Sequence, residues 1–216
     1  MGVTIGTNSG FVTSAPTADP GAFVSTTIDN TGWVTRDTSP AAAIKIKEIG
    51  WWCADATEAG NWRGALYAAD GAVVPGEAGT RLYLTANQAK GTTSGWKSVA
   101  VDWSISPSTA YWIGVGVDNV ATTTTCRYAM IGGSGFDTKN AGAAMSNPFG
   151  GGALVGAAYC AAIYVIWEAA TPGIKINIGD VWKDVTGVQI NIGDTWKTVT
   201  KGEVNIGDVW KTFFGS

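Results

Sequence analysis

Histidine is absent from the 216-residue chain, which removes the commonest general base and the commonest zinc ligand. The three cysteines, Cys53, Cys126 and Cys160, lie far apart and form no CxxC motif. That spacing excludes a zinc knuckle, and the odd number argues against a disulfide framework. Charge is scarce: Asp, Glu, Lys and Arg make up 14% of the residues and the net charge is −3. With no basic stripe, a nucleic-acid binder that neutralises phosphates is disfavoured.

Two further absences concern location. No apolar run approaches the ~18 residues of a membrane-spanning helix, so we expect no membrane association. The N-terminal segment MGVTIGTNSGFVTSAPTADPGAF lacks a basic region followed by an apolar core, so we expect no signal peptide. The expectation is therefore a soluble protein made in a cytoplasm, whose cysteines are free thiols that behave as small apolar side chains.

Tryptophan and glycine are abundant, with 11 and 30 residues, and they accompany short segments of alternating polarity. Such segments, bounded by turn residues, are typical of strands in an antiparallel two-sheet sandwich. We expect this sandwich to span 21–170, after an extended N-terminal arm at 1–20, with a long Gly-rich loop at 132–156. The expected strands are 43–53, 61–67, 95–103, 110–117, 125–131 and 159–168.

After residue 170 the sequence becomes periodic. Three copies, GIKINIGDVWKDVT, GVQINIGDTWKTVT and GEVNIGDVWKTFF, share the elements NIGD and WK at a spacing of fourteen residues. Ile-x-Ile alternation predicts a strand, and Gly-Asp is typical of a tight turn before a second strand. The sequence therefore predicts a small domain of three β-hairpins at 171–216.

The register of these hairpins has two alternatives. A two-residue loop places Ile178 opposite Val181 and Asn177 opposite Trp182, whereas a three-residue loop moves Trp182 to the isoleucine face. A single hairpin is marginally stable in water, so we expect the three to pack on one another or on other chains. The repeated tryptophans Trp182, Trp196 and Trp210 are candidates for that packing, or for binding sugar rings or a partner surface.

Four tryptophans of the sandwich are further candidates for an assembly or ligand surface: Trp51, Trp52, Trp62 and Trp112. Neighbours in a strand face opposite ways, so either Trp51 or Trp52 points away from the face that buries the other. The outward ring is either covered by a loop or another subunit, or it forms a binding platform for a glycan.

Two resemblances follow from these motifs. Leu66-Tyr67-Ala68-Ala69-Asp70-Gly71, Gly95-Trp96 and Tyr111-Trp112, within about 43–118, resemble the jelly-roll β-sandwich modules of secreted glycosidases and virion surface proteins. The stretch 173–214 resembles the short WK hairpin repeats of tailed-bacteriophage structural proteins, although Gly-Asp stands where that pattern often has Gly-Gly. The resemblance implies an all-β chain, with a jelly-roll-like sandwich followed by three hairpins, that belongs to a phage or phage-like virion.

Chemistry at a catalytic site is disfavoured. Paired carboxylates are the enzyme option left without histidine, and no pair among Glu48, Asp55, Glu58, Glu77, Asp102 and Asp118 has a diagnostic spacing. We expect no cofactor, and a structural calcium ion is left open without named ligands.

The function expected is that of a structural virion protein, of the capsid-decoration, head-fibre or tail-fibre type. It would assemble as a homotrimer and with other virion proteins through aromatic and β-branched surfaces. The alternative is a carbohydrate-binding module or a receptor-binding domain that recognises a cell-surface glycan.

Overall fold

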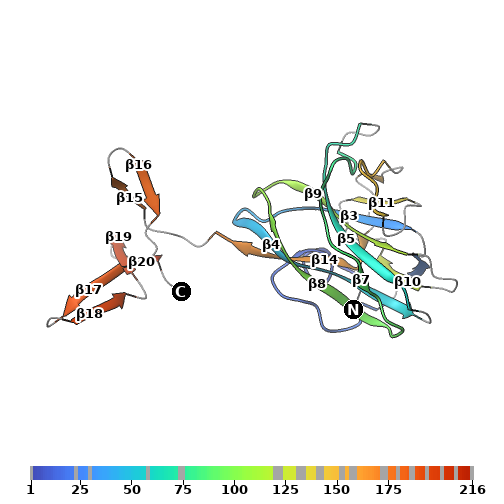
Figure 1. The fold of residues 1–216 in the computed structure, drawn as a ribbon, viewed down its shortest axis with the longest axis horizontal. Helices are drawn as coiled ribbons and strands as arrows, with labels where there is room; N and C mark the ends of the chain where they lie inside the picture. Colours follow the sequence, from blue (N-terminus) through green and yellow to red (C-terminus); the bar gives the residue numbers. More distant parts are fainter. Residues whose placement is uncertain are drawn as a thin grey trace. The chain divides into compact units, whose positions relative to one another are not determined.

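A computed structural model describes most of the chain, and every structural statement below concerns the described residues. These are 2–21, 24–28, 31–56, 59–72, 76–118, 124–129, 135–139, 144–150, 154–155, 160–170, 175–178, 181–184, 188–192, 195–199, 202–206 and 209–214. The chain divides into two units, Met1–Ala169 and Ala170–Ser216 (Figure 1). The elements assigned to the described residues of both units are β-strands, and most of their pairings are antiparallel. The fold is therefore all-β.

The first sheet of the larger unit is built around the long strand β4, Ala43–Ala56. On one side β4 pairs with β14, Ile163–Ala169, and it also pairs with β8, Gly95–Ser104. β1, Gly10–Val12, runs parallel to β14. The sheet is completed by β10 (Thr124–Ala129), which pairs with β4, and by β2 (Val24–Thr27) and β13 (Cys160–Ala161), which pair with β10.

The second sheet is antiparallel throughout its described pairs. Its strands follow the order β12 (Leu154–Val155), β11 (Gly135–Lys139), β3 (Gly32–Thr38), β9 (Ala110–Val117), β5 (Asn61–Ala68) and β6 (Arg81–Leu84), and β7 (Gln88–Ala89) pairs with β5. The segment 132–156, expected as a loop, thus contributes two strands to this sheet.

The core lies between the two sheets. Ile49 and Trp51 share a face by alternation along β4, and a β-bulge between Ile46 and Glu48 brings Ile46 to the same core; all three are fully buried. They pack in one cluster with Trp62 and other apolar residues of β5, β9 and β14, and the Trp51 and Trp62 rings meet edge to face at 6.2 Å. This packing of two inner faces is that of a β-sandwich.

The N-terminal segment differs from the extended arm that the sequence predicts. Its strand β1 belongs to the first sheet, and Phe11 and Val12 are buried there. The Ser9 hydroxyl donates to the carbonyl of Ala161 at 2.6 Å, and the Phe11 amide donates to Asp37 Oδ2 at 2.9 Å. The segment is therefore an integral edge of the sandwich, because two of its residues carry apolar side chains that the core accepts.

The smaller unit contains three two-stranded antiparallel sheets, which we call the repeat strand pairs. They are β15 (Lys175–Ile178) with β16 (Val181–Asp184), β17 (Val188–Ile192) with β18 (Thr195–Val199), and β19 (Gly202–Ile206) with β20 (Val209–Phe214). In the first, Ile178 lies opposite Val181 and Asn177 opposite Trp182, which is the register of a two-residue loop. The same register recurs in the other two. Within the described residues, no strand of one pair is bonded to a strand of another.

Candidate ligand and assembly surfaces

Three of the tryptophans predicted to form an assembly or ligand surface are buried by the chain itself. Trp51 and Trp62 are 0% and 1% exposed in the core between the sheets, and Trp112 is 0% exposed on the outer side of the second sheet. The surface assignment of these three residues is therefore wrong. Alternation correctly separates two faces of a strand, but it does not tell whether the chain itself covers each face.

The cover over Trp112 comes from segments far away in sequence. Its indole Nε1 donates to the carbonyl of Gly76 at 2.9 Å. Phe149 packs in the same cluster, edge to face with Tyr67 at 5.3 Å, and its amide donates to the carbonyl of Gly79 at 3.0 Å. Burial of a ring among apolar neighbours stabilises the fold, and it leaves no indole face for a partner.

Trp52 lies on the opposite side of β4 from Trp51, as the alternation predicts, and it is half-buried. It meets Trp96 of β8 edge to face at 5.4 Å, and Trp96 meets Tyr164 of β14 in the same way at 5.3 Å. The Trp96 indole donates to the carbonyl of Ala18 at 3.0 Å. Trp52 itself packs against the cluster of Val3, Cys160 and Ala162, so the chain covers part of this ring.

Sequence reasoning did not select Trp96 or Tyr164 for this outer aromatic cluster. The outward position of Trp96 could have been predicted, because Val99 and Trp103 of the same strand face the core and Trp96 lies on the other face. The approach of Tyr164 depends on Gly50, because a Cβ atom there would lie 2.6 Å from the tyrosine ring. A glycine opposite an aromatic residue on the neighbouring strand is thus the local signal of this contact.

Tyr164 also links the aromatic cluster to a carboxylate. Its hydroxyl donates to Glu48 Oε1 at 2.5 Å. Burial raises the pKa of the Tyr164 hydroxyl far above its ordinary value, and the hydrogen bond to Glu48 and the charge of that residue raise it further. Glu48 therefore orients a buried phenol.

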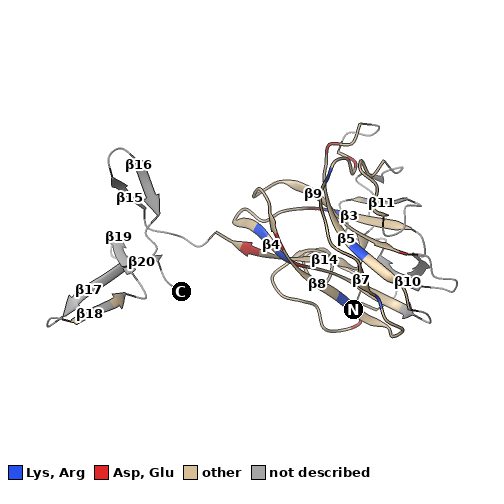
Figure 2. Cartoon of the chain, viewed as in Figure 1, with Lys and Arg blue, Asp and Glu red and all other residues tan. Residues whose placement is uncertain are grey.

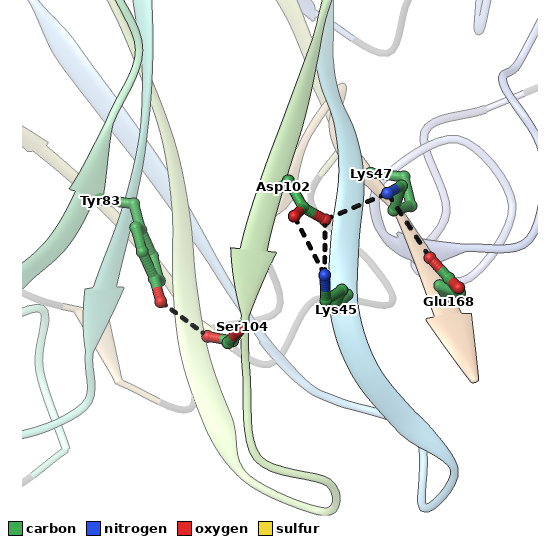
Figure 3. Close-up of polar contacts among 6 residues, drawn as sticks. All are labelled: Lys45, Lys47, Tyr83, Asp102, Ser104 and Glu168. Carbon is green, nitrogen blue, oxygen red and sulfur yellow. Dashed lines mark hydrogen bonds and ion pairs between the residues drawn. The ribbon is translucent and has the colours of Figure 1, made fainter. Parts of the chain in front are cut away.

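A ladder of alternating charges crosses three strands of the first sheet (Figure 2). Asp102 of β8 accepts from Lys45 and from Lys47 of β4, each at 3.0 Å, and Lys47 lies 3.6 Å from Glu168 of β14 (Figure 3). The side chains are 36–58% exposed. Hydrogen bonds from Lys45 and then Lys47 hold the pKa of Asp102 below its ordinary value, and the bond to Asp102 raises that of Lys47.

The ladder has two positive and two negative side chains that are exposed to solvent. It therefore contributes little to stability and offers no net charge to a partner. Its position matters more. β8 pairs only with β4 among the described strands, and a long edge with apolar residues invites pairing with other chains. Tyr83 stacks on Trp103 at a centroid distance of 5.3 Å. Its hydroxyl also donates to the Ser104 carbonyl at 3.0 Å (Figure 3). This tyrosine and the exposed charge of Asp102 disfavour pairing of β8 with another chain.

A shallow depression lies beside the N-terminal segment. It is lined by Thr7, Asn8, Pro16, Thr17, Ala18 and Asp19. The Asn8 side chain accepts from the Thr4 amide and donates to the Gly2 carbonyl, and Asp19 accepts from the Gly21 amide. These polar groups hold the segment in shape, which leaves the depression as a structural feature of the N-terminal turns.

The carboxylates considered for catalysis differ in their surroundings where their side chains are described. Glu48 binds Tyr164, Asp102 stands in the charge ladder, and Glu77 is buried at 2% exposure. The side chains of Asp55 and Glu58 lie outside the described residues. Within the described part of the chain, no three potential metal ligands from His, Cys, Asp and Glu gather at one place.

The three repeated tryptophans occupy equivalent positions in the repeat strand pairs. Trp182, Trp196 and Trp210 each have an asparagine as cross-strand partner. Directly opposite residues share a face of a sheet, and successive residues alternate between faces. The backbone register therefore places Ile176, Ile178, Val181 and Lys183 on one face of the first pair, and Asn177 and Trp182 on the other.

The chain matches no protein-family model, no curated protein and no solved structure. No described segment forms a helix with the length and hydropathy of a membrane span.

Proposed function

We propose that this chain is a structural protein of a phage-like virion, and that its repeat strand pairs are the elements through which copies assemble. One observation carries the proposal. Three two-stranded sheets share one register, each sets Ile or Val residues together with one lysine on one face, and no described strand extends any of them. Because an isolated two-stranded sheet is marginal in water, these faces need a partner.

The sandwich supports this division of labour. Its large aromatic residues Trp51, Trp62 and Trp112 are buried within the sandwich, and the charge ladder includes Asp102 of the long edge strand β8. A unit that closes its own surfaces suits a domain projecting from a particle, while the repeat strand pairs provide the contacts between chains. The resemblance of 173–214 to phage hairpin repeats adds the virion setting to this proposal.

The isoleucines on these faces offer enough apolar surface to decide the oligomeric state. Ile178, Ile192 and Ile206 occupy the same register position in the three pairs. Fully burying three isoleucines contributes about 5–9 kcal/mol, which is comparable with the ~4–15 kcal/mol that association costs. Removing these three side chains should therefore dissociate an assembly that depends on them.

The test measures the mass of the full chain by light scattering during size exclusion. We expect a homotrimer that persists on dilution, and a monomer for the triple variant I178S/I192S/I206S. Near-ultraviolet circular dichroism, which reports on the buried rings of the sandwich, should be the same for both proteins. The control K175Q/E203Q changes two polar positions to the residue that the second repeat carries, Gln189, and should remain trimeric.

Two results would contradict the proposal. One is a monomeric wild-type chain at every concentration. The other is a triple serine variant that keeps the mass of the wild type, because association would then run through a different surface.

A further inference from the structure

The face of each repeat strand pair opposite its Ile and Val residues carries a recurring pair of side chains. Asn177 lies across from Trp182, Asn191 across from Trp196, and Asn205 across from Trp210. Cross-strand neighbours on one face stand about 5 Å apart at Cβ, so both side chains of such a pair can contact one small group.

The three copies differ at the next cross-strand pair on the same face. This pair is Lys175 with Asp184 in the first copy, Gln189 with Thr198 in the second and Glu203 with Thr212 in the third. A cation facing an acid, two neutral groups, and an acid facing a hydroxyl are thus all compatible with the same register. The Asn and Trp positions, by contrast, are identical in every copy, as are the other residues of the shared NIGD and WK elements.

An asparagine opposite a tryptophan is not an arrangement chosen for strand pairing. The cross-strand pairs that stabilise sheets are aromatic with aromatic, aromatic with β-branched, or oppositely charged. Asparagine is also among the residues depleted in strands. Strand pairing therefore gives no reason for this combination, and both groups are available to a ligand.

We propose that the three Asn–Trp pairs are binding sites for the pyranose rings of a polysaccharide. An indole offers a flat apolar face that fits the C–H face of a sugar ring, while it adds one N–H donor. The asparagine amide both donates and accepts, which matches neighbouring sugar hydroxyls. Three identical sites on one chain suit a ligand that repeats itself, because each further contact then benefits from a high effective concentration.

The charge of the chain favours this occupant over a nucleic acid, which would also stack on tryptophan. The whole chain carries a net charge of −3, and the stretch 171–216 contains five lysines and five acidic residues. It therefore offers no excess of positive charge to a phosphate backbone, whereas a neutral glycan needs none. The inference concerns the face opposite the proposed assembly face, and it does not rest on the virion assignment.

The experiment runs the full chain through native gels that contain a soluble probe polysaccharide, and follows tryptophan emission in titrations with the same probes. The probes are a β-glucan, a mannan and a chito-oligosaccharide, with single-stranded oligothymidylate as the competing class. We expect retardation by at least one glycan and none by the oligonucleotide. Each Asn→Ala change among N177A, N191A and N205A should weaken binding about fivefold, and the triple variant on the order of a hundredfold.

The control K175Q/E203Q alters the neighbouring pair in two copies and should bind as the wild type does. Light scattering on the triple asparagine variant separates binding from assembly, since its oligomeric mass should be unchanged. The inference is overturned if no probe glycan binds, if the oligonucleotide binds instead, or if the triple variant binds normally. It is also overturned if that variant loses its oligomeric state, because the asparagines would then serve packing.

Discussion

Gly64 sits at a point where the two sheets of the sandwich approach closely, and replacing it tests the packing of the core. A Cβ atom at this position would lie 2.8 Å from Ile49 Cγ2 and 2.9 Å from Ile49 Cδ1. Carbon atoms in contact prefer about 3.5–4.0 Å, so the isoleucine or the sheets must give way. The backbone is not itself an obstacle, because Gly64 lies within β5 and its φ is not in the left-handed region.

The magnitude follows from two opposing effects. Overpacking a core costs about 1–3 kcal/mol, whereas replacing glycine by alanine within a strand regains about 0.5–1 kcal/mol of backbone entropy. We therefore expect G64A to lower the free energy of unfolding of the sandwich by about 1–2 kcal/mol. In an I49A background the obstructing atoms are gone, so the same change should raise that free energy by about 0.5–1 kcal/mol.

Urea denaturation followed by near-ultraviolet circular dichroism measures all four proteins of this cycle. The variant G2A serves as the control, since a Cβ atom at Gly2 meets nothing within 4 Å and stability should stay within about 0.5 kcal/mol. The decisive quantity is the sign of the G64A effect in the two backgrounds. Equal destabilisation in both would refute the contact between Gly64 and Ile49 as its cause.

Three smaller predictions follow. W96F, which keeps a ring but loses the donor to the Ala18 carbonyl, should cost about 1 kcal/mol and speed amide exchange in 13–20; unchanged exchange would contradict this. K45M should raise the pKa of Asp102 toward its ordinary value, as a carboxyl carbon NMR titration would show. Because its pKa is raised, Tyr164 keeps its hydroxyl proton in the folded state at a pH where the unfolded chain has lost it. The free energy of unfolding should therefore fall as the pH rises above about 10. In an alkaline denaturation series, Y164F should show a smaller fall than the wild type.

Much of the fold follows from local patterns. Two-residue alternation marks β4, β5, β8, β9 and β14 close to their observed bounds, because a strand with one buried face must alternate. The fourteen-residue period likewise delimits the repeat strand pairs, since each copy carries its own strands and turn residues. The choice between two registers was open in the sequence, because one extra loop residue inverts the face on which Trp182 lies.

Such patterns could not predict contacts between segments that are distant in the sequence. The sequence predicts Trp112 at a surface, whereas residues such as Gly76 and Phe149 bury it in the structure. The sequence could not show this cover, because no periodicity links those residues to β9. The parallel pairing of β1 with β14 joins residues more than 150 positions apart, as in Gly10 and Tyr164, and no turn signal in the sequence predicts it. Lys45 and Asp102 meet only because β4 and β8 are neighbours in one sheet. Periodicity along a chain reports which side chains share a face, whereas the question of what lies against that face is answered by the folding of the whole chain around it.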